Sequence, residues 1–303
     1  MLNTPVAFIV FNRPDVTRKV FEAIRQARPQ TLFIIADGAR PHKAGEYERC
    51  TEVRKIVSEI DWECDVRTRF QETNLGCKRN VSSGISWVFE HVESAIILED
   101  DCLPQPSFFR FCEELLERYK DDERIMQISG TNLQFGRTRG EASYYFSKYN
   151  SIWGWATWRR AWKNYDVDMK TFPDFMRSEQ LQNILRDPQI QKKWQTDFQA
   201  MYEQKIDTWD YQWVYTIWSQ RGMAVVPNTN LVTNLGFGAD ATHTTNADSL
   251  LNSMKSEDIE FPLRHPNFFS VDEYADAFVE ETMMQARLKD RIMNKVKRLT
   301  GMR

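Results

Sequence analysis

The chain lacks a paired-cysteine pattern, a long apolar run and an excess of positive charge. Its five cysteines are an odd number and contain no CxxC spacing, which excludes a regular disulfide framework and favours free thiols in a reducing compartment. The formal net charge of -3 supplies no global basic field of the kind that nucleic-acid binding relies on. We therefore expect an intracellular protein without a nucleic-acid partner.

No basic leader precedes the first apolar run, Val6–Phe11, which is too short for a signal peptide or a membrane span. Repeats and low-complexity linkers are also missing. With 303 residues, of which 42% are hydrophobic, the chain can build a substantial core. We expect one continuous globular unit.

The first hundred residues alternate apolar runs with amphipathic helical patterns, which is typical of βαβ units. The expected strands are Val6–Phe11, Leu32–Ala36, Cys64–Phe70 and Ala95–Leu98, and the expected helices are Asp15–Ala27, Glu46–Ile60, Lys78–His91 and Ser107–Tyr119. The pattern predicts an α/β fold with a Rossmann-like, mostly parallel sheet flanked by helices. The loops at the carboxyl ends of its strands should form one ligand-binding crevice.

Residues 126–279 show a mixed, largely helical pattern rich in tryptophan. We expect helices at Glu179–Leu185, Gln189–Glu203 and Tyr211–Gln220, and a strand at Ala224–Val226. The chain has ten Trp residues, which either line a sugar-binding cleft or belong to the core. We divide the unit into a nucleotide-sugar-binding half (1–125), an acceptor-binding half (126–279) and a C-terminal helix (280–303).

Three adjacent acids, Glu99-Asp100-Asp101, directly follow the apolar run Ala95–Leu98. Such carboxylates repel one another unless a cation or a hydrogen-bond donor compensates them, and Mg²⁺ or Mn²⁺ with phosphate oxygens commonly does so. Acidic runs are more often solvated loops. Here a buried strand precedes the triplet and a Pro-containing turn into an aromatic helix follows it, which favours a functional site.

The segment 95–109, AIILEDDCLPQPSFF, resembles the metal-site segment of GT-A glycosyltransferases related to N-acetylglucosaminyltransferase I, where EDD replaces the usual DxD motif. Val6–Arg13 resembles the opening strand and nucleotide loop of these enzymes. Ile34–Gly38 resembles their second strand, and Asn74–Asn80 their "NxG" loop. The resemblance covers roughly residues 5–120 and implies a GT-A-type fold.

The resemblance implies a role for each matching residue. Asp101 would bind Mn²⁺ (or Mg²⁺), Asp100 would contact the ribose, and Glu99 would support the sugar or nucleotide. Asp37 would face the base. Asn12 and Arg13 fall in the nucleotide loop, and Lys78 or Arg79 would meet the diphosphate, since a guanidinium can hold phosphate oxygens bidentately.

Sugar transfer with inversion requires a base for the acceptor hydroxyl. Asp210, in the segment Thr208–Trp213, resembles that base in the family's "WDDW"-like segment; the alternative is that it caps the helix starting at Tyr211. Asn150–Trp158 resembles the aromatic "GW" loop, in which Trp153 and Trp155 would form the pocket walls and Gly154 would admit the sugar. Alternatively, both Trp side chains are core.

Asn234–Gly238 resembles a loop that closes over the donor, and His243 beyond it would be a second metal ligand or a structural residue. The segment Glu280–Arg303 has the pattern of a basic amphipathic helix. It either contacts anionic lipid or packs as a terminal helix. We expect a cytoplasmic protein, with this tail favouring contact with the inner membrane face.

Together, these features predict a metal-dependent glycosyltransferase. It would move a sugar, by resemblance N-acetylglucosamine, from a UDP-linked donor to a glycan or lipid-linked acceptor. A sugar nucleotidyltransferase is an alternative, but the segment Phe11–Asp15 lacks the glycines of the loop that such enzymes carry after the first strand. A non-catalytic carbohydrate-binding module is the other alternative.

Overall fold

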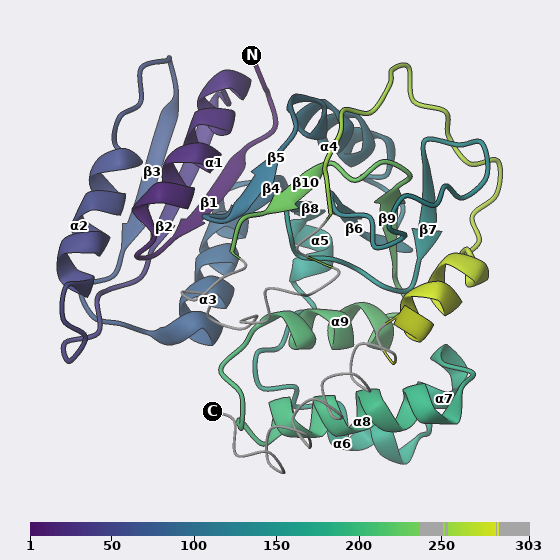
Figure 1. The fold of residues 1–303 in the computed structure, drawn as a ribbon. Coiled ribbons are helices and arrows are strands. Elements are labelled where there is room, and N and C mark those ends of the chain that lie inside the picture. Colours follow the sequence, from purple (N-terminus) through teal and green to yellow (C-terminus); the bar gives the residue numbers. More distant parts are fainter. Residues whose placement is uncertain (237–250, 252–253, 283, 285–303) are drawn as a thin grey trace, which may run out of the picture.

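The computed structural model describes residues 1–236, 251, 254–282 and 284, arranged around a central sheet (Figure 1). This sheet has eight strands in the order β3-β2-β1-β4-β8-β6-β9-β7. The strands are β1 (Val6–Val10), β2 (Thr31–Ala36), β3 (Asp65–Phe70), β4 (Ser94–Glu99), β6 (Ile125–Ser129), β7 (Tyr144–Ser147), β8 (Trp155–Trp158) and β9 (Met223–Pro227). A smaller antiparallel sheet pairs β5 (Cys102–Pro104) with β10 (Val232–Asn234).

The four strands from the first hundred residues, β1 to β4, pair with one another in parallel, as the βαβ pattern predicts. The later strands are mixed, because β8 runs antiparallel to both β4 and β6, and β7 antiparallel to β9, while β6 and β9 are parallel. The expected α/β fold with a Rossmann-like, mostly parallel sheet is confirmed. One sheet connects the two halves of the chain, since β8 of the second half pairs with β4 of the first.

Helices cover both faces of the sheet (Figure 1). They are α1 (Pro14–Ala27), α2 (Glu46–Ile56), α3 (Gly76–His91), α4 (Pro106–Arg118), α5 (Arg159–Trp162), α6 (Phe172–Arg177), α7 (Gln180–Ile184), α8 (Pro188–Tyr202) and α9 (Asp210–Ser219). Alternate side chains of β1 point to opposite faces. Phe8 therefore joins the core under α1, α2 and α4, whereas Ile9 joins the core under α3, α8 and α9.

Local sequence explains why α1 begins and ends where it does. Pro14 occupies the first turn, where its missing N–H removes no helical hydrogen bond. Val20, Phe21 and Ile24 recur at helical spacing and are buried. The helix stops at Arg28, whose left-handed backbone (φ 51°) lets its N–H bond the carbonyl of Ile24.

Tryptophan forms much of the second core. Trp155 is fully buried in β8 and stacks on Trp209 with ring centroids 5.7 Å apart. The expectation that Trp155 belongs to a loop and forms a wall of the donor pocket was therefore wrong. The core alternative holds for this residue because β8 lies between β4 and β6 in the middle of the sheet.

A helix over residues 273–282 packs against β7 near the end of the described chain. The buried Asp276 accepts hydrogen bonds from the Ser147 hydroxyl and the Lys148 N–H. Burial raises the pKa of Asp276 to about 6. The expected helix Glu280–Arg303 lies outside the described residues from 285 onward, so its contact with a membrane stays a prediction. Among the described helices, none is long and apolar enough to span a bilayer.

Candidate functional site

The predicted acids lie at one edge of the sheet. Glu99 ends β4, and Asp100 and Asp101 form the turn that leads into β5. The neighbouring strand β1 ends just before Asn12 and Arg13, and Asp37 follows β2. Because parallel strands bring their carboxyl ends to the same edge, the structure places these residues at one edge of the sheet, as expected.

Arg13 compensates two acids of the triplet. Its guanidinium contacts a carboxylate oxygen of Asp100 and lies 2.9 Å from Oδ2 of Asp101. Asp100 is only 3% exposed. Burial opposes the charge on Arg13, but the Asp100 and Asp101 carboxylates raise its pKa overall and keep it charged. Arg13 is thus an internal counter-cation of the triplet.

The ion pairs with Arg13 leave two carboxylate oxygens of the triplet without a hydrogen-bond partner among the described residues. Burial raises the pKa of Glu99 to about 8, and the charges of Asp101, Asp100 and Asp210 add to the effect. Oε1 of Glu99 and Oδ2 of Asp100 are buried and have no hydrogen-bond partner among the described residues. A buried, unpartnered carboxylate oxygen is costly. The triplet therefore has unused capacity for a cation or a donor.

The donor chemistry fits a hard divalent cation. Carboxylate oxygens are ligands of Mg²⁺ and Mn²⁺, which proteins often hold through one or two carboxylates plus substrate phosphates. Within the described residues, no group of three or more His, Cys, Asp or Glu side chains forms a ready metal cage. The binding of Mn²⁺ or Mg²⁺ at the triplet stays a prediction.

Asp37 anchors a neighbouring loop. Its carboxylate accepts hydrogen bonds from the N–H groups of Gly38 (2.8 Å), Leu75 (2.8 Å) and Gly76 (3.0 Å), and from the Asn74 amide (2.9 Å). These contacts fix the start of α3 beside the crevice. The contact of Asp37 with a nucleotide base stays a prediction.

Asp207 is a site residue that the sequence analysis missed. Its carboxylate accepts hydrogen bonds from the N–H groups of Cys77 and Lys78, each at 3.1 Å, and so caps α3 from a distant part of the chain. No local pattern signals a cap 130 residues from its helix. Lys78 is 8% exposed and Arg79 is exposed beside this cap. Their contact with a diphosphate stays a prediction.

Asp210 opens α9 and accepts a hydrogen bond from the Thr208 hydroxyl. Trp209 is the N-cap residue and makes no side-chain cap, so the alternative that Asp210 caps the helix was wrong. The charge of Asp210 is one of those that raise the pKa of Glu99. The structure therefore brings the candidate base within electrostatic range of the triplet, although the two are far apart in sequence.

The backbone at Gly154 adopts a left-handed conformation (φ 64°) that favours glycine. A Cβ atom there would lie 2.7 Å from Cγ2 of Val232, so β10 packs directly on this residue. The Gly154 carbonyl accepts a hydrogen bond from Gly130 at 2.7 Å. Trp153, just before it, is partly exposed and packs against the first core.

The segment after β10 lies over the acid triplet. The Leu235 N–H donates to the Asp101 carbonyl at 2.7 Å, and a Cβ on Gly236 would lie 2.1 Å from Oδ2 of Asp101. The expected loop Asn234–Gly238 lies outside the described residues from 237 onward, so its closure over a donor stays a prediction. His243, the candidate second metal ligand, lies outside the described residues. Asn12 turns to α2, where its amide donates to Glu46 at 2.8 Å.

No protein-family model and no curated protein matches the chain. Solved structures show a general likeness. An apo UDP-glucose pyrophosphorylase is 9% identical with a TM-score of 0.40, covering 76% of this chain and 93% of that one. A UDP-glucose complex of a UDP-glucose pyrophosphorylase is 9% identical with a TM-score of 0.34, covering 54% of this chain and 79% of that one.

A third likeness is to 4-diphosphocytidyl-2C-methyl-D-erythritol synthase from Anaerococcus prevotii, at 8% identity and a TM-score of 0.34. It covers 54% of this chain and 76% of that one. At these identities and TM-scores, the likenesses assign no role to any residue of this chain.

Proposed function

We propose that the chain is a glycosyltransferase that takes a sugar from a nucleotide-diphosphate donor and passes it to a hydroxyl of a glycan or lipid-linked acceptor. The observation that supports this most is the state of the acid triplet. Two of its carboxylate oxygens, on Glu99 and Asp100, are buried at the carboxyl edge of the sheet without a hydrogen-bond partner in the part of the chain that the structure describes. A diphosphate and its cation would occupy a place of this kind.

On this proposal, the edge of the sheet binds the donor. Asp101 would hold Mn²⁺ or Mg²⁺, which stabilises the diphosphate leaving group when bound. Asp100 would orient the ribose. Arg13, already charged and next to both acids, would offer its guanidinium to the phosphate oxygens. UDP and N-acetylglucosamine are our first choice of donor through the sequence resemblance.

Asp210 would accept the proton of the acceptor hydroxyl. It is partly exposed, and its carboxylate is held by Thr208 at the start of α9. A base on one side of the sugar and a leaving diphosphate on the other produce inversion at the anomeric carbon. The charge of Asp210 contributes to the raised pKa of Glu99, so these two carboxyl groups interact. Glu99 would support the donor sugar.

Nucleotidyl transfer is the competing reaction, and two of the similar structures are UDP-glucose pyrophosphorylases. The two reactions break different bonds. Glycosyl transfer breaks the bond between the sugar and the diphosphate and releases UDP, whereas the reverse nucleotidyl transfer uses pyrophosphate and releases UTP and sugar 1-phosphate. The first-strand loop of this chain, without glycines at Phe11–Asp15, favours glycosyl transfer.

Product analysis tests the proposal. The full chain is incubated with UDP-N-acetylglucosamine and Mn²⁺, with and without pyrophosphate, and the nucleotides are separated by chromatography. Slow UDP release that requires Mn²⁺ and is lost in Asp101→Asn supports glycosyl transfer. The exposed Asp121→Asn is the control and should keep the activity. UTP formed only with pyrophosphate would instead establish the nucleotidyltransferase, and no product from any UDP-sugar would favour a binding module.

A further inference from the structure

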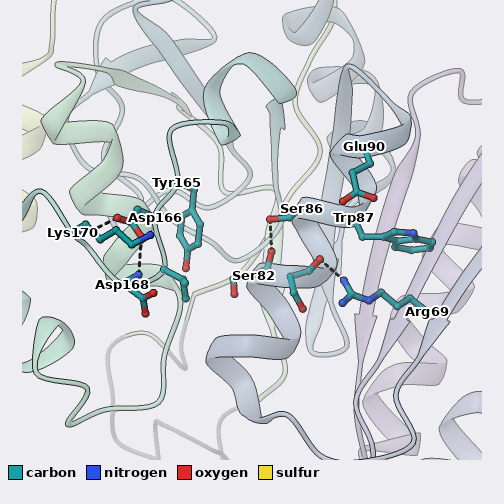
Figure 2. A pocket seen from close by; sticks show the side chains of 11 residues that line it. Arg69, Ser82, Ser86, Trp87, Glu90, Tyr165, Asp166, Asp168 and Lys170 are labelled. Carbon is teal, nitrogen blue, oxygen red and sulfur yellow. Dashed lines mark hydrogen bonds between the residues drawn. The ribbon is translucent and has the colours of Figure 1, made fainter.

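A shallow groove of about 610 Å³ lies along α3 (Figure 2), and no residue of the acid triplet lines it. Ser82, Ser83 and Ser86 form its floor. One wall is the segment 165–170, and Trp87, Glu90 and Arg69 complete the lining. Nothing in the donor chemistry above uses these residues.

The floor of the groove consists of hydroxyls that can still accept hydrogen bonds. Each serine donates to a carbonyl one turn earlier in α3, Ser82 to Lys78 (2.6 Å), Ser83 to Arg79 (2.6 Å) and Ser86 to Ser82 (2.9 Å). A hydroxyl oxygen has two acceptor lone pairs. Ser86 Oγ already accepts from Nε1 of Trp162 at 3.0 Å, so it keeps one acceptor position for a ligand. The small size of the three serines leaves room for a ligand on the helix surface.

The walls combine both signs of charge with two aromatic rings. The acids are Glu90, Asp166 and Asp168, and the cations are Arg69 and Lys170. The Asp166 carboxylate accepts the N–H groups of Asp168 (3.0 Å) and Lys170 (2.8 Å), which fixes the loop. Arg69 is held by the Ser83 carbonyl. Trp87 is partly exposed, and its ring packs edge-on against Phe33.

This composition selects among ligand classes. A polyanion would meet three carboxylates, and an apolar helix would strip water from five charged groups without replacing their hydrogen bonds. A neutral polyhydroxylated chain suits the groove, since its hydroxyls both donate to carboxylates and accept from cations, and a pyranose ring can pack on indole. The size of the groove is also that of typical ligand sites.

Tyr165 connects the groove to the proposed reaction site. Its hydroxyl donates to the Trp209 carbonyl at 3.0 Å, directly before Asp210, and its ring stacks on Trp162 at 4.2 Å. Burial raises the pKa of Tyr165, and the charge of Asp210 adds to this. The inner end of the groove therefore adjoins the segment that carries the candidate base.

We propose that the groove along α3 binds a neutral oligosaccharide, namely the part of the acceptor glycan that lies away from the hydroxyl receiving the sugar. The acceptor role rests on the proposed function, but saccharide binding in the groove does not. A glycan seated on the serine floor would contact Trp87 and Glu90 on its outer side. Its other end would extend past Tyr165 towards Asp210.

Saturation-transfer NMR and calorimetry test the proposal on the full chain, without metal or donor. The probes are cellotetraose, maltotetraose and chitotetraose. We expect at least one to bind saturably, and Trp87→Ala to weaken it roughly five- to tenfold. Trp62→Ala is the matched control, because this partly exposed Trp packs on the opposite face of the sheet and should leave binding unchanged.

Because Trp87 also packs on the buried Phe33, Trp87→Ala could weaken binding by disturbing the core. A second variant that changes only exposed groove residues separates the two effects. The side chains of Glu90 and Lys170 are exposed and make no hydrogen bond or ion pair among the described residues. The double change Glu90→Ala and Lys170→Ala should therefore fold, because it keeps the Lys170 N–H that donates to Asp166, and it should still weaken binding at least threefold. If no probe binds the unaltered chain, or if a folded groove variant binds as tightly as the unaltered chain, the groove is not a saccharide site.

The Asp101→Asn variant separates this inference from the proposed function. Oligosaccharide binding should survive that change, because Asp101 does not line the groove. If saccharide binding depends on the groove while no UDP-sugar binds the chain, the groove proposal stands and the donor proposal falls.

Discussion

Arg13 and Asp101, which follow adjacent strands of the sheet, form an ion pair with 2.9 Å between a guanidinium nitrogen and Oδ2. The same guanidinium contacts the buried Asp100. One arginine thus neutralises part of a triplet in which Oε1 of Glu99 and Oδ2 of Asp100 have no hydrogen-bond partner among the described residues. This relationship links the fold, which brings the ends of β1 and β4 together, to the proposed binding of a diphosphate and its cation.

Removing Arg13 should destabilise the metal-free protein. Arg13→Gln leaves the buried Asp100 without its ion partner, and we expect a loss of about 2–4 kcal/mol in the free energy of unfolding. Urea unfolding measures it. Arg18→Gln is the control, because Arg18 pairs with Glu59 on the surface and its loss should cost about 0.5 kcal/mol or less. Equal losses in the two variants would contradict the role given to Arg13.

Asp207 should stabilise the start of α3. Asp207→Ala removes the acceptor of two helix N–H groups, and we expect a loss of about 1–2 kcal/mol in the free energy of unfolding. Hydrogen exchange should increase at the amides of Cys77 and Lys78. The exposed Asp121→Ala serves as the comparison and should change neither quantity. Unchanged exchange at both amides would show that Asp207 is not their cap.

Gly154 should resist substitution for two separable reasons. Gly154→Ala adds left-handed backbone strain and a contact with Val232, and we expect a loss of about 2–4 kcal/mol. Gly140 has nearly the same φ, 66°, but a Cβ there meets nothing within 4 Å. Gly140→Ala therefore measures the strain alone, about 1 kcal/mol. Thermal unfolding of the two variants compares them, and an equal effect would refute the packing of β10 on Gly154.

Asp276 should make stability depend on pH. Its pKa is about 6 in the folded protein and ordinarily 3.8, so the folded state binds the extra proton between these values. Stability therefore falls as pH rises through this interval. Between pH 5 and 7.5 this group should remove about 1–1.5 kcal/mol, a dependence that Asp276→Asn abolishes. The measurement is urea unfolding of both proteins at the two pH values, and parallel pH profiles would contradict it.

Sequence predicted the first half of the fold closely, because each strand there is a short apolar run next to a helix with its own amphipathic pattern. The expected helix Asp15–Ala27, for instance, is α1, Pro14–Ala27. The second half was harder. The strands β5 to β8 and β10 were not expected, because their pairing partners lie far along the chain. The helices α5 and α6 were not expected either, because 4 and 6 residues are too few to show an amphipathic pattern.

In the candidate site, too, sequence predicted the residues that follow strands and missed the contacts between distant parts of the chain. The triplet, Arg13 and Asp37 could be placed at one edge because they directly follow strands. The ion pair of Arg13 with the triplet and the cap formed by Asp207 could not be predicted, since both are long-range contacts. Trp155 shows the limit of residue type as a guide, because an aromatic next to glycine suits a sugar pocket as well as a core strand.

Calorimetric titration of the full chain with UDP-N-acetylglucosamine, with Mn²⁺ and with a chelator, tests the central proposal most directly. We expect binding with Mn²⁺, and a loss of at least about tenfold in affinity both with the chelator and in Asp101→Asn, corresponding to about 1.4 kcal/mol. Binding of equal strength in all three conditions would show that the acid triplet does not hold a cation with the donor diphosphate.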